Sequence, residues 1–187
     1  MEGVLRTLRW TLAIRALLAI AIGVGCLYRP HGIDRWLMPV FGGYATVEGL
    51  LILTAAAVLR WPALFLQAFV SLAFGIFALA SPTSLAAFGA LPLGAWGAST
   101  GLLQILAAFR LRELFRGEWL MAASGVVTAI AGATLIAAAL RIGGFIVPPA
   151  AAGSAASQVW LIATWAFTSG VIVLGLVWRL TRTSVRM

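Results

Sequence analysis

Few residues of this chain carry a formal charge, and this scarcity excludes most protein classes. Charged residues make up 10% of the 187 positions, where an ordinary soluble domain has about 25%, and apolar residues make up 63%. This composition excludes a soluble globular domain, a disordered chain and a disulfide scaffold. It predicts a polytopic membrane protein.

Cysteine, histidine and lysine are also scarce. Cys26 is the single cysteine, so the chain forms no disulfide within itself. His31 is the single histidine, which excludes a metal site built from cysteine and histidine in a monomer. We therefore expect no metal and no cofactor. All thirteen basic residues are arginine.

A net charge of +8 raises nucleic-acid binding as an interpretation, but the arginines interrupt apolar runs and do not form one basic face. No charged residue occurs in the 49 residues from Trp61 to Phe109, nor in the 37 residues from Ile142 to Trp178. Runs of this length fit spans of about 20 residues across a bilayer. We therefore expect a lipid bilayer and no nucleic acid as the partner.

The first 26 residues resemble a secretory signal, because a basic start and an apolar stretch lead to Gly25 and Cys26. A lipoprotein cleavage box has a leucine-like residue three positions before the cysteine, where this chain has Gly23. The segment also matches later spans. We expect it to be a retained helix.

Apolar runs between proline-rich breakers predict an all-α fold with six transmembrane helices. Their expected ranges are 9–28, 37–59, 62–80, 85–109, 119–140 and 159–179. The runs do not alternate as the strands of a membrane barrel would.

An internal repeat divides the chain into three helical hairpins. One hexapeptide pattern, which is aromatic, small, two variable residues, polar and glycine, occurs at 44–49, 96–101 and 165–170. From Gly23 to Gly49 is 26 positions, as from Gly75 to Gly101, whereas Gly132 to Gly170 is 38. The third unit therefore has a 12-residue insertion. We expect one domain over 1–187 with repeat units 9–60, 62–112 and 119–182.

Arginine counting predicts the orientation. Six spans put both termini on one side, and that side holds ten arginines against three on the other. Both termini are therefore expected in the cytoplasm. A basic surface is expected on that side, formed by Arg110, Arg112, Arg116, Arg179, Arg182 and Arg186. Topology alone explains this surface, and anionic lipid headgroups would bind it at about 1 kcal/mol per charge.

The repeat resembles the HdeD-like acid-resistance membrane proteins, a family built from a short repeat of unknown function. The resemblance rests on the arginine-led first helix reaching Gly23 and Pro30, on 41–49, on Gly75 to Pro82, on 96–101 and on the basic segment 110–112. It covers about residues 9–182. It implies a bacterial inner (plasma) membrane protein with six helices and a role in stress and acid resistance. The family provides no catalytic residues, and the long loop near 146–158 departs from its compact hairpins.

Glu48 is the one carboxylate inside an expected span, and a charge at mid-bilayer costs about 2.5–3.5 kcal/mol on insertion scales. Arg15 is its expected partner, about 7.5 Å away in depth for five residues of helix. One interpretation is a protonation switch or polar pathway at Glu48. The other is a buried pair that fixes the first two helices against each other. Both remain open at this point.

Other polar residues of the expected spans follow the repeat. Thr100 and Ser169 occupy the position of Glu48, and Gln67 that of Arg15, while Gln104 follows the second hexapeptide. Their interpretations are interhelical hydrogen bonding and contact with a solute. The hexapeptides also contain small-xxx-small pairs, which predict close packing in the monomer or, alternatively, in a homo-oligomer. These pairs are Ala45 and Gly49, Gly97 and Gly101, Ala166 and Gly170.

No motif of an enzyme is present: the chain has no phosphate-binding glycine loop, GxSxG elbow, HExxH or pair of close carboxylates. We expect no catalytic residue. The first hypothesis is a non-enzymatic HdeD-like membrane protein, and the second is a proton- or solute-conducting transporter or channel that uses Glu48. The third is a membrane scaffold that packs through its small-residue faces.

Overall fold

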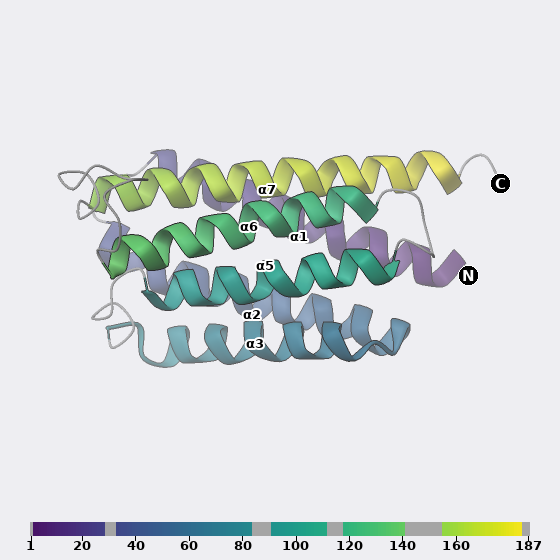
Figure 1. The fold of residues 1–187 in the computed structure, drawn as a ribbon, viewed down its shortest axis with the longest axis horizontal. Coiled ribbons are helices and arrows are strands. Elements are labelled where there is room, and N and C mark those ends of the chain that lie inside the picture. The colour runs from purple at the N-terminus through teal and green to yellow at the C-terminus, as the bar shows by residue number, and fades with distance from the viewer. Residues whose placement is uncertain (1, 29–32, 84–90, 112–117, 141–154, 185–187) are drawn as a thin grey trace.

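The structure is a computed structural model that describes residues 2–28, 33–83, 91–111, 118–140 and 155–184. Its helices are α1 (Glu2–Tyr28), α2 (Ile33–Leu59), α3 (Pro62–Ala80), α5 (Leu91–Leu111), α6 (Glu118–Ala139) and α7 (Ala155–Ser184). They lie side by side along one long axis, and both chain ends lie at the same end of the bundle (Figure 1). We call that end the terminal face and the other end the opposite face.

Six helices of the described chain are long and apolar enough to cross a membrane. These spans are 9–28, 37–59, 62–80, 91–109, 119–139 and 160–182. The predicted all-α fold with six spans is thereby confirmed. Residues 85–90, with which the fourth predicted span begins, lie outside the described residues.

Proline and the backbone conformation of Arg60 define the turn between α2 and α3. Trp61 is extended before α3 and Pro62 occupies the first turn, where its missing N–H removes no helical bond. Arg60, just before it, has a positive φ of 51°, the left-handed conformation that commonly terminates a helix. The α2–α3 connection is therefore a sharp turn of few residues.

The helices that pack most closely belong to different repeat units, and not to the same one. α2 packs most closely on α3, α5 on α6 and α1 on α7, whereas α1–α2, α3–α5 and α6–α7 have fewer contacts. The first and last helices therefore close the bundle into a ring. Each close pair joins two different repeat units.

Repeated glycines make these close pairs possible. A Cβ added at Gly23 would come 2.9 Å from the Phe167 backbone nitrogen, and one at Gly170 would come 2.9 Å from the Ala16 oxygen. Gly49 approaches the backbone of Leu72 in the same way, at 3.0 Å. Small residues permit this backbone approach between membrane helices, where dispersion contacts drive association.

The bundle is apolar outside and partly polar inside. The residue after each hexapeptide glycine is exposed, as at Leu50, Leu102 and Val171, and so presents an aliphatic side chain to lipid. Among the residues whose side chains are described, the buried polar ones are Glu48, Gln67, Ser71, Thr100, Gln104, Ser124, Thr128 and Ser169. Polar groups at the bilayer core cost free energy, so their inward placement is the one that the membrane favours.

Candidate functional site

An ion pair joins α1 to α2 inside the bundle. Arg15 Nη2 lies 2.7 Å from Glu48 Oε1, and the two side chains are 13% and 2% exposed. A charge-assisted bond of this length is strong, although much of its energy offsets the desolvation of the two charges. The sequence predicted this pairing, and the structure places the two residues in direct contact.

Arg15 also contacts a third helix. With the Gln104 side-chain oxygen turned toward the guanidinium, Arg15 Nη1 donates to it at 2.8 Å, and Nη2 contacts it as well. The Tyr44 hydroxyl on α2 forms a further hydrogen bond with Arg15. We call Arg15, Tyr44, Glu48 and Gln104 the arginine cluster. It holds α1, α2 and α5 together.

A group of aromatic rings lies next to this cluster, toward the opposite face. The rings of Tyr44 and Trp96 have centroids 6.0 Å apart, and those of Trp96 and Trp165 are also 6.0 Å apart. Phe41 stacks on Trp165 at 5.9 Å, and Phe74 stacks on Trp96 at 5.5 Å. The first residues of all three hexapeptides therefore meet at one place, as approximate threefold symmetry requires.

Two of these aromatic residues make the same hydrogen bond in different repeat units. Trp96 Nε1 donates to Ser71 Oγ at 3.3 Å, and Trp165 Nε1 donates to Thr128 Oγ1 at 3.1 Å. Ser71 and Thr128 each lie four residues before a repeated glycine, a signal that sequence reasoning missed. In the first unit that position is Ala19, and Tyr44 bonds to Arg15 instead.

The remaining predicted polar residues are buried but do not bond to Glu48. The Thr100 hydroxyl donates to the Trp96 carbonyl at 2.8 Å, and Ser169 donates to the Ala166 carbonyl at 3.2 Å, each within its own helix. Gln67 is 1% exposed, and neither atom of its amide has a hydrogen-bond partner among the described residues. Such a group costs about 1–3 kcal/mol per unmade bond. Glu48 Oε2 also lacks a partner there.

The small-residue pairs lie in contacts within the chain. Ala45 and Ala166 are fully or nearly fully buried, and Gly49 and Gly170 contact α3 and α1. Gly97 and Gly101 face α6 across the α5–α6 contact. These faces are therefore covered by neighbouring helices of the same bundle.

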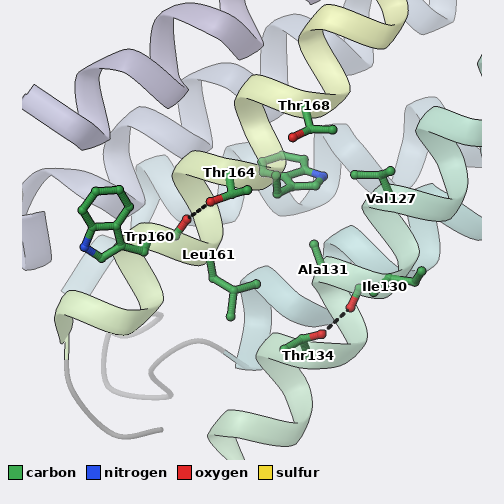
Figure 2. A pocket seen from close by; sticks show the side chains of 9 residues that line it. Val127, Ile130, Ala131, Thr134, Trp160, Leu161, Thr164 and Thr168 are labelled. Carbon is green, nitrogen blue, oxygen red and sulfur yellow. Dashed lines mark hydrogen bonds between the residues drawn. The ribbon is translucent and has the colours of Figure 1, made fainter. Parts of the chain in front are cut away.

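A wide groove runs between α6 and α7 (Figure 2). It has a volume of about 640 Å³ and is lined mainly by apolar side chains, with Trp160 near the start of the last span. The hydroxyls of Thr134 and Thr164 donate to the carbonyls of Ile130 and Trp160, so the backbone of their own helices satisfies them. The groove therefore presents an apolar wall on the outside of the bundle.

Arginines at the terminal face contact tryptophans. The Arg182 guanidinium lies 3.8 Å from the centroid of the Trp178 ring, and that of Arg179 lies 5.4 Å from the Trp119 ring. Such cation–π contacts anchor helix ends at a membrane interface. The other four arginines of the predicted basic surface, Arg110, Arg112, Arg116 and Arg186, lie outside the residues whose side chains are described.

Part of the chain matches a known family. Residues 66–137 match a family model described as a short repeat of unknown function (DUF308). The matched segment covers most of α3, all of α5 and most of α6, and agrees with the repeat found in the sequence. No curated protein matches the chain. No solved structure matches it. The repeat match and the six spans indicate a multi-pass integral membrane protein.

Proposed function

We propose that this chain is a non-enzymatic, HdeD-like protein of a bacterial inner membrane that acts in the response to acid stress. The observation that carries the proposal is the buried Arg15–Glu48 pair. Protonation of Glu48 would remove its negative charge and leave Arg15 as an uncompensated charge inside the bundle. One proton would therefore change the energy of the contact among three helices by several kcal/mol.

The surroundings of the pair support a proton-responsive role over catalysis. Glu48 is the one carboxylate of the expected spans. It lies beside a guanidinium and a phenol, with the Gln104 amide on the far side of Arg15 and no second acid nearby among the described residues. Enzymes that use paired acid and base groups need two such groups within reach of one substrate. Both termini are proposed to lie in the cytoplasm, with anionic lipids at the basic terminal face.

An acid-survival assay tests this proposal. The gene is deleted from a bacterium that carries it, and the deletion strain then expresses wild-type protein, Glu48→Gln or the control Thr54→Val. The amount of protein in the membrane is matched among the three. Thr54 lies on the same helix, is exposed, and donates to the Leu51 carbonyl. We expect wild type and Thr54→Val to restore survival at low pH and Glu48→Gln to fail. Equal survival of the deletion strain and its parent would contradict the proposal.

A second candidate is a proton- or solute-conducting transporter or channel, and the unpartnered Glu48 Oε2 favours it. Conduction also requires a path across the aromatic rings, which are packed and buried at Phe41, Tyr44 and Trp96. Proton flux into proteoliposomes, with wild type beside Glu48→Gln, separates the two candidates. Flux that disappears in the variant supports conduction, and absence of flux from folded protein excludes it.

The third candidate, a scaffold, would need faces other than the small-residue pairs, because other helices of the bundle cover those pairs.

A further inference from the structure

A small cavity lies near the terminal face, between α1, α2, α3 and α6. Its volume is about 40 Å³. Leu59 near the end of α2, Leu64 near the start of α3 and Met121 near the start of α6 are among its walls, which places it in the terminal half of the bundle. Arg15, Thr11 and Gln67 also line it. A site of this size has room for water, since one molecule needs about 10–15 Å³ and two to four polar partners.

Gln67 is the side chain that most needs a ligand there. It is 1% exposed, and both its amide nitrogen and its amide oxygen lack a hydrogen-bond partner among the described residues. Buried amides in folded proteins are almost always hydrogen-bonded to protein or to ordered water. A ligand that fits Gln67 must both donate and accept, as water does.

The charges around the cavity do not favour an anion as its ligand. Arg15 lines the cavity, but Glu48 at 2.7 Å already compensates its charge. A neutral ligand is therefore favoured.

Arg15 also links the cavity to Glu48. Its guanidinium lines the cavity and contacts Glu48, whose second carboxylate oxygen has no partner among the described residues. Arg15 from α1 contacts Glu48, Tyr44 interacts with it from one turn earlier on the same helix, and Gln104 from α5 reaches it only through Arg15. Arg15 is the only one of these that carries a charge.

The opposite side of Glu48 is closed. Tyr44 lies one helical turn before it on α2, and Phe41 lies almost two turns before it. Both are buried against the Trp96 ring, and Phe41 also stacks on Trp165. These packed rings lie between Glu48 and the opposite face, where a water path from that face would have to pass.

We propose that water bound by Gln67 and Arg15 in this cavity gives Glu48 proton exchange with the aqueous phase at the terminal face and not at the opposite face. A hydronium ion delivers its proton to the Glu48 carboxylate and remains as water, so the step needs no other reactant. The cavity then makes the ion pair responsive to pH on one side of the membrane. This proposal is independent of the acid-stress role, because water can reach Glu48 from one side whatever the cell uses it for.

Cysteine labelling tests the sidedness. Cys26→Ala removes the single thiol, and Gln67→Cys then places one thiol in the cavity. Ser71→Cys is the matched control, since Ser71 lies one turn farther along α3, is fully buried and accepts a hydrogen bond from Trp96. A membrane-impermeant methanethiosulfonate is added to vesicles of either orientation.

We expect Gln67→Cys to react at least about tenfold faster from the terminal face than from the opposite face, and Ser71→Cys to react from neither. Reaction of Gln67→Cys no faster than that of Ser71→Cys, or faster from the opposite face, would overturn the proposal.

A second measurement does not depend on cysteine variants. Infrared difference spectra of wild type minus Glu48→Gln isolate the Glu48 carboxyl, and its response is followed after an acid step on one side of oriented vesicles. We expect a response to acid at the terminal face that slows by about tenfold or more in Gln67→Leu, which keeps the side-chain size but binds no water. A response only to acid at the opposite face, or an unchanged rate in Gln67→Leu, would overturn the proposal.

Discussion

The first repeat unit differs from the other two in the polar contact that its hexapeptide aromatic residue makes. In the second and third units an indole N–H donates to a hydroxyl of the same unit, Trp96 to Ser71 and Trp165 to Thr128. In the first unit the equivalent aromatic residue is Tyr44, which bonds to Arg15, and Arg15 pairs with Glu48. At the positions of Arg15 and Glu48 the second unit has Gln67 and Thr100. Two units therefore pack without an ion pair, which indicates that packing alone does not require one.

The largest expected effect on stability comes from removing one residue of the ion pair. Arg15→Gln leaves Glu48 as a buried charge without its partner, and we expect a loss of about 3–5 kcal/mol in the free energy of unfolding. The double variant Arg15→Gln/Glu48→Thr gives the first unit the two residues of the second, and we expect it to recover most of that loss. Unfolding in mixed micelles measures both. A double variant as unstable as Arg15→Gln would show that the first unit needs the pair in order to fold.

The next effect tests what all three units share. Gly23→Ala and Gly132→Ala would each push a Cβ against the backbone of a neighbouring helix, at Phe167 and Ala98 respectively. We expect each to cost about 1–3 kcal/mol, because backbone atoms cannot rotate away. Gly25→Ala is the control, with nothing within 4 Å of its added Cβ, and it should be neutral or stabilising. If only one of the two interfaces were sensitive, the threefold packing would have to be abandoned.

The smallest effect concerns the indole bonds. Trp165→Phe leaves the Thr128 hydroxyl without its donor and should cost about 1–2 kcal/mol, with Trp96→Phe similar at Ser71. Both variants should keep acid survival, because neither residue bonds to the arginine cluster. Tyr44→Phe should impair survival as well as stability, since it removes a partner of Arg15. Equal survival of Tyr44→Phe and Trp165→Phe would remove the functional distinction between the units.

The sequence alone predicted most of the architecture. The six spans follow from apolar runs and proline breakers, and the ends of the second and third expected spans, at 59 and 80, are the helix ends in the structure. α1 and α7 extend beyond the expected ranges, because an amphipathic or basic turn can continue a helix into the interface without adding apolar residues. The repeat predicted which residues are equivalent.

Helix pairing was beyond the reach of the sequence. The repeat divides the chain into hairpin units, but the repeated glycines pack between units and not within them, as Gly23 does against α7. The Arg15–Glu48 contact was expected from depth, whereas the role of Gln104 was not, because it depends on the rotation of α5. The bonds to Ser71 and Thr128 were not predicted, because their indole donors come from other helices.

We expect the Arg15–Glu48 pair to serve the function of the protein and to be dispensable for its fold. The most direct test is acid survival of the deletion strain that expresses Arg15→Gln/Glu48→Thr, with membrane level and unfolding stability measured on the same variant. We predict a protein that inserts and folds close to wild type but does not restore survival. A double variant that restores survival at wild-type levels would contradict the claim, because the pair would then have no functional role.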